Sequence, residues 1–264
     1  MNWALAALAA MVGYLFGSVS FARVVFARLA PGEEPLKLRT PTVDGKAELV
    51  SHAVGGTNVM VRFGPKWGMA VTALDASKAF IPTLALGLLY PDEPYNLLCA
   101  VFVLIGHLWP VWYGFEGGGG NSCILGMLLA ISPLALVVTH AGGYLIGRLV
   151  PMFAYLAGVA LTIPWFAWRD GVPSPEFWFG IAITIIYFLG QLPEVIAARR
   201  LTAAGHKLDI EYTMRTMRSA AKTGKPGAEI ATEHVAEAAG DAGSEAVTQG
   251  SAGAAPNADS RDAT

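Results

Sequence analysis

Three polar segments interrupt an otherwise apolar sequence and carry the residues that could do chemistry. The first, "SHAVGGTNVMVRFG", spans Ser51 to Gly64 and sets glycines, Gly56 among them, directly before Thr57 and Asn58. Glycines leave backbone N–H groups exposed, and successive N–H groups of this kind form a concave site for an anion. Arg62 adds a positive charge to the same segment. The segment therefore suits a phosphate group, although an ordinary turn can have the same composition.

The second segment, "DASK", places Asp75 and Lys78 three residues apart inside an apolar run. At this spacing the two side chains share one face of a helix. A charge inside a membrane segment is costly and is usually paired or functional. The pair is therefore either a structural ion pair or part of a functional site.

The third segment is a glycine run that follows His107 and comprises Gly117, Gly118, Gly119 and Gly120. Glycine is costly in regular structure and useful where the backbone must approach a ligand closely. The run is either a flexible linker or a loop whose amides hold an anion. His107 is either a packing residue or part of the same site.

Composition places these segments in a membrane protein. Hydrophobic residues make up 54% of the 264 residues and charged residues 14%, whereas soluble domains carry roughly 25% charged residues. We expect an all-α, polytopic membrane protein with a bundle of about seven transmembrane helices, some of them shorter than the roughly 20 residues of a full span. The apolar runs are Trp3 to Leu29, Trp67 to Tyr90, Leu97 to Phe115, Cys123 to Ile131, Leu134 to Leu149, Met152 to Trp168 and Phe177 to Leu192.

The fourth and fifth runs are read as two short spans because Pro133 disfavours a helical conformation at Ser132. Basic residues gather in the loop after the first run and after the last run. By the positive-inside rule, the N-terminus lies outside, and the glycine loop and the C-terminus lie in the cytoplasm.

Three regions follow from these patterns. Residues 1–200 form the transmembrane domain, and residues 201–223 form a possible surface helix. Residues 224–264 form an acidic, low-complexity tail that has too little apolar surface to fold and is expected to be disordered. The sequence contains no metal-binding spacing, and nothing in it indicates a cofactor or a nucleic-acid partner.

Taken in order, the polar segments resemble those of the bacterial acyl-phosphate:glycerol-3-phosphate acyltransferase family (PlsY type). The stretch "GYLFGSVSFARVVFARL" is similar to the family's first span, and three further motifs are similar to "GGTNVMVRFG", "LDASKAFIP" and "GHLWPVWYGFEGGGGN". The resemblance covers roughly Gly13 to Arg200. It implies an enzyme of the plasma (inner) membrane that passes a fatty acyl group from acyl phosphate to glycerol 3-phosphate, giving lysophosphatidate in phospholipid biosynthesis.

The resemblance also implies site residues and partners. The catalytic group would be Ser51, Asn58, Asp75, Lys78 and His107. The substrate-binding group would be Gly56, Thr57, Arg62, Gly117, Gly118, Gly119 and Gly120. The implied partners are acyl phosphate, glycerol 3-phosphate and the lipid bilayer, with no cofactor and no metal.

Several positions depart from the family's motifs. Ala53 stands where the family has asparagine, and Arg62 lies one place after the family's arginine. Gly119 aligns with the family's phosphate-binding lysine, and Gln191 and Glu194 replace its His-x-x-Asn. An alternative interpretation is therefore a catalytically silent relative that serves as a membrane subunit or lipid-binding partner.

Overall fold

The first apolar run forms two helices, where the sequence predicts one. In the computed structural model, which describes residues 1–148 and 154–223, α1 (Trp3–Gly17) stops three residues before α2 (Phe21–Leu29). Ser20 begins α2, where its side-chain oxygen accepts a hydrogen bond from the backbone N–H of Arg23 at 3.4 Å. The break exposes the backbone carbonyl of Val19, which becomes a ligand for a buried lysine described below.

Four helical stretches in the described residues are long and apolar enough to cross a membrane: Trp3–Leu29, Pro65–Leu89, Tyr95–Tyr113 and Pro175–Ala203. Pro65–Leu89 is α4 and Pro175–Ala203 is α10, whereas Tyr95–Tyr113 comprises α5 (Tyr95–Leu108) and a 3₁₀ turn, η1 (Val111–Tyr113). The remaining helices between α5 and α10 are shorter. The all-α membrane fold is thus confirmed, but the expected number of seven spans is not established.

The short helices include the expected break at proline. Helix α6 (Asn121–Ile131) ends at Ser132, whose backbone is extended, and α7 (Pro133–Gly147) begins with proline at its first position. The Ser132 hydroxyl oxygen accepts from the N–H of Ala135 at 3.2 Å and so caps α7. After the undescribed residues 149–153, α8 (Ala154–Ala160) and α9 (Thr162–Arg169) form the next pair.

Glycines allow α1 and α5 to pack closely. A Cβ atom on Gly17 would lie 2.2 Å from the carbonyl oxygen of Val103, and one on Gly106 would lie 2.2 Å from that of Tyr14. Small residues at such contacts let helix backbones approach each other in a membrane protein. This packing fixes α5 against α1, so that the end of α5 and the α1–α2 break lie near each other.

The structure contains a β-hairpin that the sequence does not predict. Strands β1 (Arg39–Pro41) and β2 (Glu48–Val50) pair antiparallel, with Thr40 opposite Leu49. Each strand has only three residues and no clear alternation of polar and apolar side chains, so the usual strand pattern is absent. A side-chain contact between Arg39 and Glu48 links the two strands.

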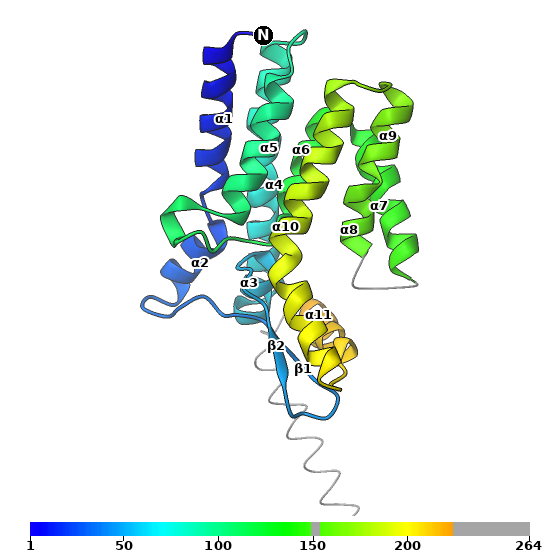
Figure 1. Cartoon of the computed structure of the whole chain (residues 1–264). Coiled ribbons are helices and arrows are strands. Elements are labelled where there is room, and N and C mark those ends of the chain that lie inside the picture. The colour runs from blue at the N-terminus through cyan, green and yellow to red at the C-terminus, as the bar shows by residue number, and fades with distance from the viewer. Residues whose placement is uncertain (149–153, 224–264) are drawn as a thin grey trace, which may run out of the picture.

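Figure 1 shows the N-terminus at one end of the bundle and the hairpin, α3 (Gly56–Phe63) and α11 (Ile210–Thr223) at the other. The backbone N–H of Asp209 donates to the carbonyl of Pro41 at 2.8 Å, which ties the start of α11 to the hairpin. A helix therefore occupies most of region 201–223, and its position on a membrane surface stays a prediction. The expectation for residues 224–264 falls outside the described residues.

Candidate active site

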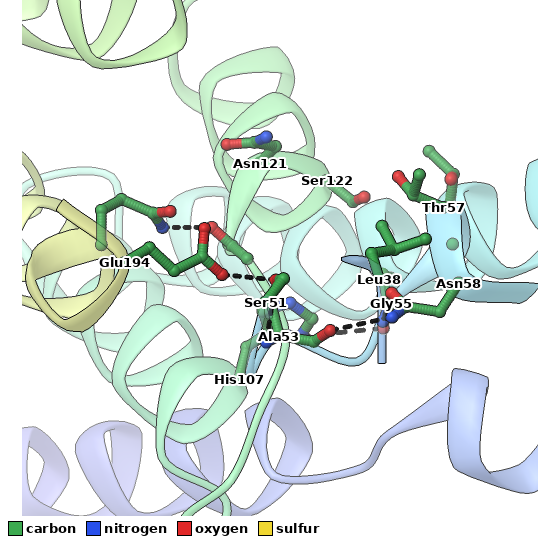
Figure 2. A pocket seen from close by; sticks show the side chains of 16 residues that line it. Leu38, Ser51, Ala53, Gly55, Thr57, Asn58, His107, Asn121, Ser122 and Glu194 are labelled. Carbon is green, nitrogen blue, oxygen red and sulfur yellow. Dashed lines mark hydrogen bonds and ion pairs between the residues drawn. The ribbon is translucent and has the colours of Figure 1, made fainter. Parts of the chain in front are cut away.

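A polar pocket opens at the end of the bundle that carries the hairpin and α3. It gathers residues from segments that are far apart in the sequence (Figure 2). The start of α3, the middle of α4, the end of α5, the start of α6 and the second half of α10 all contribute. The lining residues are Leu38, Ser51, Ala53, Gly55, Gly56, Thr57, Asn58, Thr72, Asp75, His107, Gly119, Gly120, Asn121, Ser122, Gln191 and Glu194.

A buried lysine, Lys78, lies behind the residues that line this pocket. The Lys78 Nζ lies 2.9 Å from Asp75 Oδ1, and both side chains are 3% exposed. The same nitrogen donates to the carbonyl of Val19 at 2.6 Å and to Nδ1 of His107 at 2.9 Å. A lysine ammonium has three N–H donors and no acceptor. It therefore donates to one partner in α5 and one in the α1–α2 break, and it forms an ion pair with Asp75 in α4.

These contacts define the protonation of His107. Because the Lys78 ammonium can only donate, His107 Nδ1 must accept, so the imidazole is neutral with its proton on Nε2. Asp75 Oδ1 lies at ion-pair distance from Lys78 but receives no well-aligned hydrogen bond. The ion pair is therefore mainly electrostatic, and Asp75 remains part of the pocket wall.

His107 packs under the glycine loop. The N–H of Gly118 donates to the carbonyl of His107 at 3.0 Å. A Cβ atom on Gly117 would lie 2.1 Å from the same carbonyl oxygen, and one on Gly118 would lie 2.4 Å from His107 Nε2. Gly119 differs, because nothing lies within 4 Å of the place a Cβ would take. Two glycines are thus required for packing, while Gly119 faces open space in the pocket.

Two helices begin at the pocket. Gly120 precedes α6 with a left-handed backbone (φ +85°), and no side chain caps that helix. At α3, Asn58 Oδ1 accepts from the N–H of Gly55 at 2.9 Å, and its Nδ2 donates to the carbonyls of Leu36 and Ala53 at 2.8 and 3.0 Å. The first turns of helices leave backbone N–H groups unpaired and favour anions. Asn58 therefore holds the α3 start in place, and the neighbouring Thr57 lines the pocket.

Helix α10 closes the pocket with two polar side chains. Gln191 Nε2 donates to the carbonyl of Gly119 at 3.0 Å, and the Ser51 hydroxyl donates to Glu194 Oε1. Tyr187, one turn before Gln191, donates from its hydroxyl to Asn121 Oδ1 at 2.5 Å. The glycine loop, the start of α6 and the segment before α3 are thus all linked to α10.

Arg62 lies outside the pocket lining. Its Nη2 pairs with Glu33 at 3.1 Å, on the loop that follows α2. Arg23, also outside the lining, donates to the carbonyl of Glu116 at 3.0 Å. No lysine or arginine lines the pocket within the described part of the chain. The pocket therefore combines backbone amides and neutral polar groups with two carboxylates.

Most predicted site residues meet at this pocket, although their roles in catalysis stay predictions. Ser51, Gly56, Thr57, Asn58, Asp75, His107, Gly119 and Gly120 line it, Lys78 supports it from behind, and Gly117 and Gly118 hold the loop. Sequence reasoning missed Thr72, one turn before Asp75 on α4, and Asn121 and Ser122, which directly follow the glycines. Their positions beside recognised motifs were the available signal. No group of three or more metal-binding side chains lies in residues 1–148 and 154–223.

Together the apolar helices and the polar pocket at one end define an integral membrane protein with an internal site for a small polar molecule. Comparison with known proteins identifies its relatives. A family model described as glycerol-3-phosphate acyltransferase matches residues 7–198. The chain belongs to this family.

Individual relatives agree with this assignment. A glycerol-3-phosphate acyltransferase from Anaeromyxobacter dehalogenans (strain 2CP-C) is 35% identical over 210 residues, covering 77% of this chain and 96% of the relative. One from Hyphomonas neptunium is 33% identical, covering 70% and 84%. Crystal structures of PlsY (YgiH), an integral membrane glycerol 3-phosphate acyltransferase, match with a TM-score of 0.59 in both the lysophosphatidic acid form (26% identity) and the glycerol 3-phosphate form (25% identity). Each match covers 77% of this chain and 94% of the PlsY chain.

The buried ion pair yields a first prediction. Lys78→Met leaves the Asp75 carboxylate buried without its counter-charge, so it should lower the free energy of unfolding by about 3–5 kcal/mol. The double variant Lys78→Met/Asp75→Asn removes both charges and should recover most of that loss. Thermal unfolding of the detergent-solubilised protein measures both effects. A single variant that is as stable as the double variant would contradict the account.

The glycine loop yields a second prediction. Gly117→Ala forces a methyl group against backbone carbonyls, and overpacking of this kind costs about 1–3 kcal/mol. Gly119→Ala is the matched control, because its methyl group would meet open space. The unfolding temperature should therefore fall for Gly117→Ala and stay close to the wild-type value for Gly119→Ala. Equal shifts would show that the loop does not pack on His107 as described.

Proposed function

We propose that this protein transfers a fatty acyl group from acyl phosphate to a hydroxyl group of glycerol 3-phosphate, releasing lysophosphatidate and inorganic phosphate. The single observation that carries the proposal is the convergence of two helix starts and the glycine loop on one polar pocket. The relatives and solved structures described above carry the name of this activity.

The pocket offers anion-binding groups that do not depend on side-chain cations. The first residues of α6 and of α3 line it. Helix N-termini leave backbone N–H groups unpaired and attract negative charge. Thr57, Ser122 and Asn121 add neutral hydrogen-bonding groups at the same place. The phosphate of the donor would lie against these groups.

The reaction needs little chemical assistance from side chains. Acyl phosphate is already an activated mixed anhydride, so holding the two substrates in reactive geometry can supply much of the acceleration. The acceptor hydroxyl oxygen forms a bond to the acyl carbon, the bond from that carbon to the phosphate oxygen breaks, and the hydroxyl proton leaves with the phosphate. Hydrogen-bond donors that point at the carbonyl oxygen of the acyl group stabilise the negative charge that develops on this oxygen during the reaction.

The proposal includes an orientation in the plasma (inner) membrane. Lys37, Arg39, Lys46 and Lys66 lie in the segments around the hairpin and at the start of α4, and Arg199 and Arg200 lie near the end of α10. These segments belong to the end of the bundle that carries the hairpin and α3 (Figure 1). An excess of basic residues marks the cytoplasmic side. The pocket would accordingly face the cytoplasm, with the N-terminus outside.

The direct test is an assay of the purified, detergent-solubilised protein with palmitoyl phosphate and glycerol 3-phosphate. We expect phosphate release that depends on glycerol 3-phosphate, with lysophosphatidate formed in equal amount by mass spectrometry. Omission of the acceptor measures the background hydrolysis. Release that stays at background would reject the proposal and favour a catalytically silent family member. The lack of a lysine or arginine among the described residues that line the pocket suggests this alternative.

The open space at Gly119 yields a further prediction about the acceptor. Gly119→Lys places an ammonium where the family has its phosphate-binding lysine, and a hydrogen bond to a charged group contributes about 1.5–3 kcal/mol. Because ~1.4 kcal/mol corresponds to tenfold, the KM for glycerol 3-phosphate should fall about tenfold. Gly119→Met is the matched control for side-chain length and should not lower KM. Steady-state kinetics decide, and an equal effect of both substitutions would reject the role of charge.

A further inference from the structure

Among the described residues that line the pocket, Glu194 carries a negative charge that no neighbouring positive side chain offsets. Its carboxylate accepts a hydrogen bond from the Ser51 hydroxyl, and Figure 2 shows it directed from α10 toward the segment before α3. Among the described residues, no lysine or arginine forms an ion pair with it. Ser51 is neutral, so the hydrogen bond leaves the negative charge in the pocket.

The charges around the pocket add up to an excess of one negative charge. Asp75 and Glu194 supply two carboxylates, and Lys78 supplies one ammonium that already lies 2.9 Å from Asp75. A lysine ammonium can only donate, and only a neutral imidazole can accept through Nδ1, so His107 is counted here without a charge. Like charges repel more strongly inside a protein than in water, because the effective dielectric constant is lower. An acceptor with a phosphate group is therefore opposed by Glu194, while an uncharged acceptor is not.

The remaining groups suit the hydroxyl groups of a polyol. Glu194 and Asp75 can accept hydrogen bonds from hydroxyls, and Thr57, Asn121 and Ser122 can donate or accept. We propose that Glu194 determines acceptor selectivity, and that this pocket acylates uncharged polyols, of which glycerol is the simplest, in addition to glycerol 3-phosphate. This inference rests on the proposed acyl transfer from acyl phosphate.

Acyl transfer to glycerol involves the same bond changes as acyl transfer to glycerol 3-phosphate. A glycerol hydroxyl oxygen bonds to the acyl carbon, the bond between that carbon and the phosphate oxygen breaks, and the proton leaves with the phosphate. The products are a monoacylglycerol and inorganic phosphate. No further reactant is required.

The test compares glycerol with glycerol 3-phosphate as acceptors for palmitoyl phosphate, using the purified full-length protein. Wild type should release phosphate in a glycerol-dependent manner and form monoacylglycerol. Glu194→Gln keeps an oxygen that can accept from Ser51 but removes the charge. It should raise the ratio of kcat/KM for glycerol 3-phosphate to kcat/KM for glycerol about tenfold, corresponding to ~1.4 kcal/mol. Glu34→Gln, at an exposed loop position outside the pocket, is the matched control and should change neither value.

The outcomes separate this inference from the proposed function. If wild type uses glycerol 3-phosphate but forms no monoacylglycerol, the inference is overturned while the proposed function stands, and this result does not depend on any variant. If Glu194→Gln changes kcat/KM for both acceptors by the same factor, Glu194 does not select by charge, and the inference is again overturned. If no acceptor supports turnover, both the proposed function and the inference fail.

Discussion

The structure depends on the buried ammonium of Lys78. A charge at this depth needs partners that offset its loss of hydration. Lys78 donates to His107 on α5 and to the Val19 carbonyl in the break between α1 and α2, and it forms an ion pair with Asp75 on α4. The break has a physical role, because a continuous first helix would use the Val19 carbonyl for its own ladder. The polar contacts of Lys78 thereby fix the relative positions of α1, α4 and α5, which apolar packing alone would define less specifically.

The pocket is built outward from this lysine. His107 accepts from Lys78 through its side chain and from the glycine loop through its backbone, so the loop is positioned by the same network. The loop leads into α6, whose uncapped start faces the pocket, and Gln191 on α10 holds the loop from the opposite side. The backbone amides that we propose to bind the substrate phosphate are thus placed by packed helices. This preorganisation suits a reaction in which positioning and electrostatic stabilisation do most of the work.

Much of the helical fold could be predicted from the sequence, because apolar runs and the proline at position 133 have local physical causes. Asp75, Lys78 and the glycine run could be identified as site candidates because such residues are costly where they stand. The hairpin could not be predicted, since its strands are too short to show an alternation of polar and apolar residues. The position of Arg62 outside the pocket, and of Glu194 inside it, depends on the packing of α3 and α10 against the rest of the bundle. Sequence order alone does not contain that information.

The central claim is that one pocket, formed by α3, α4, α5, α6 and α10, holds the substrates by backbone amides. The most direct measurement is an experimental structure of the protein with a non-hydrolysable acyl phosphonate in place of acyl phosphate. The account predicts the phosphonate within hydrogen-bond distance of backbone N–H groups at the start of α6, with the acyl chain leading away from the pocket between helices. A phosphonate bound at any site that does not include Gly119, Gly120 or Asn121 would contradict it.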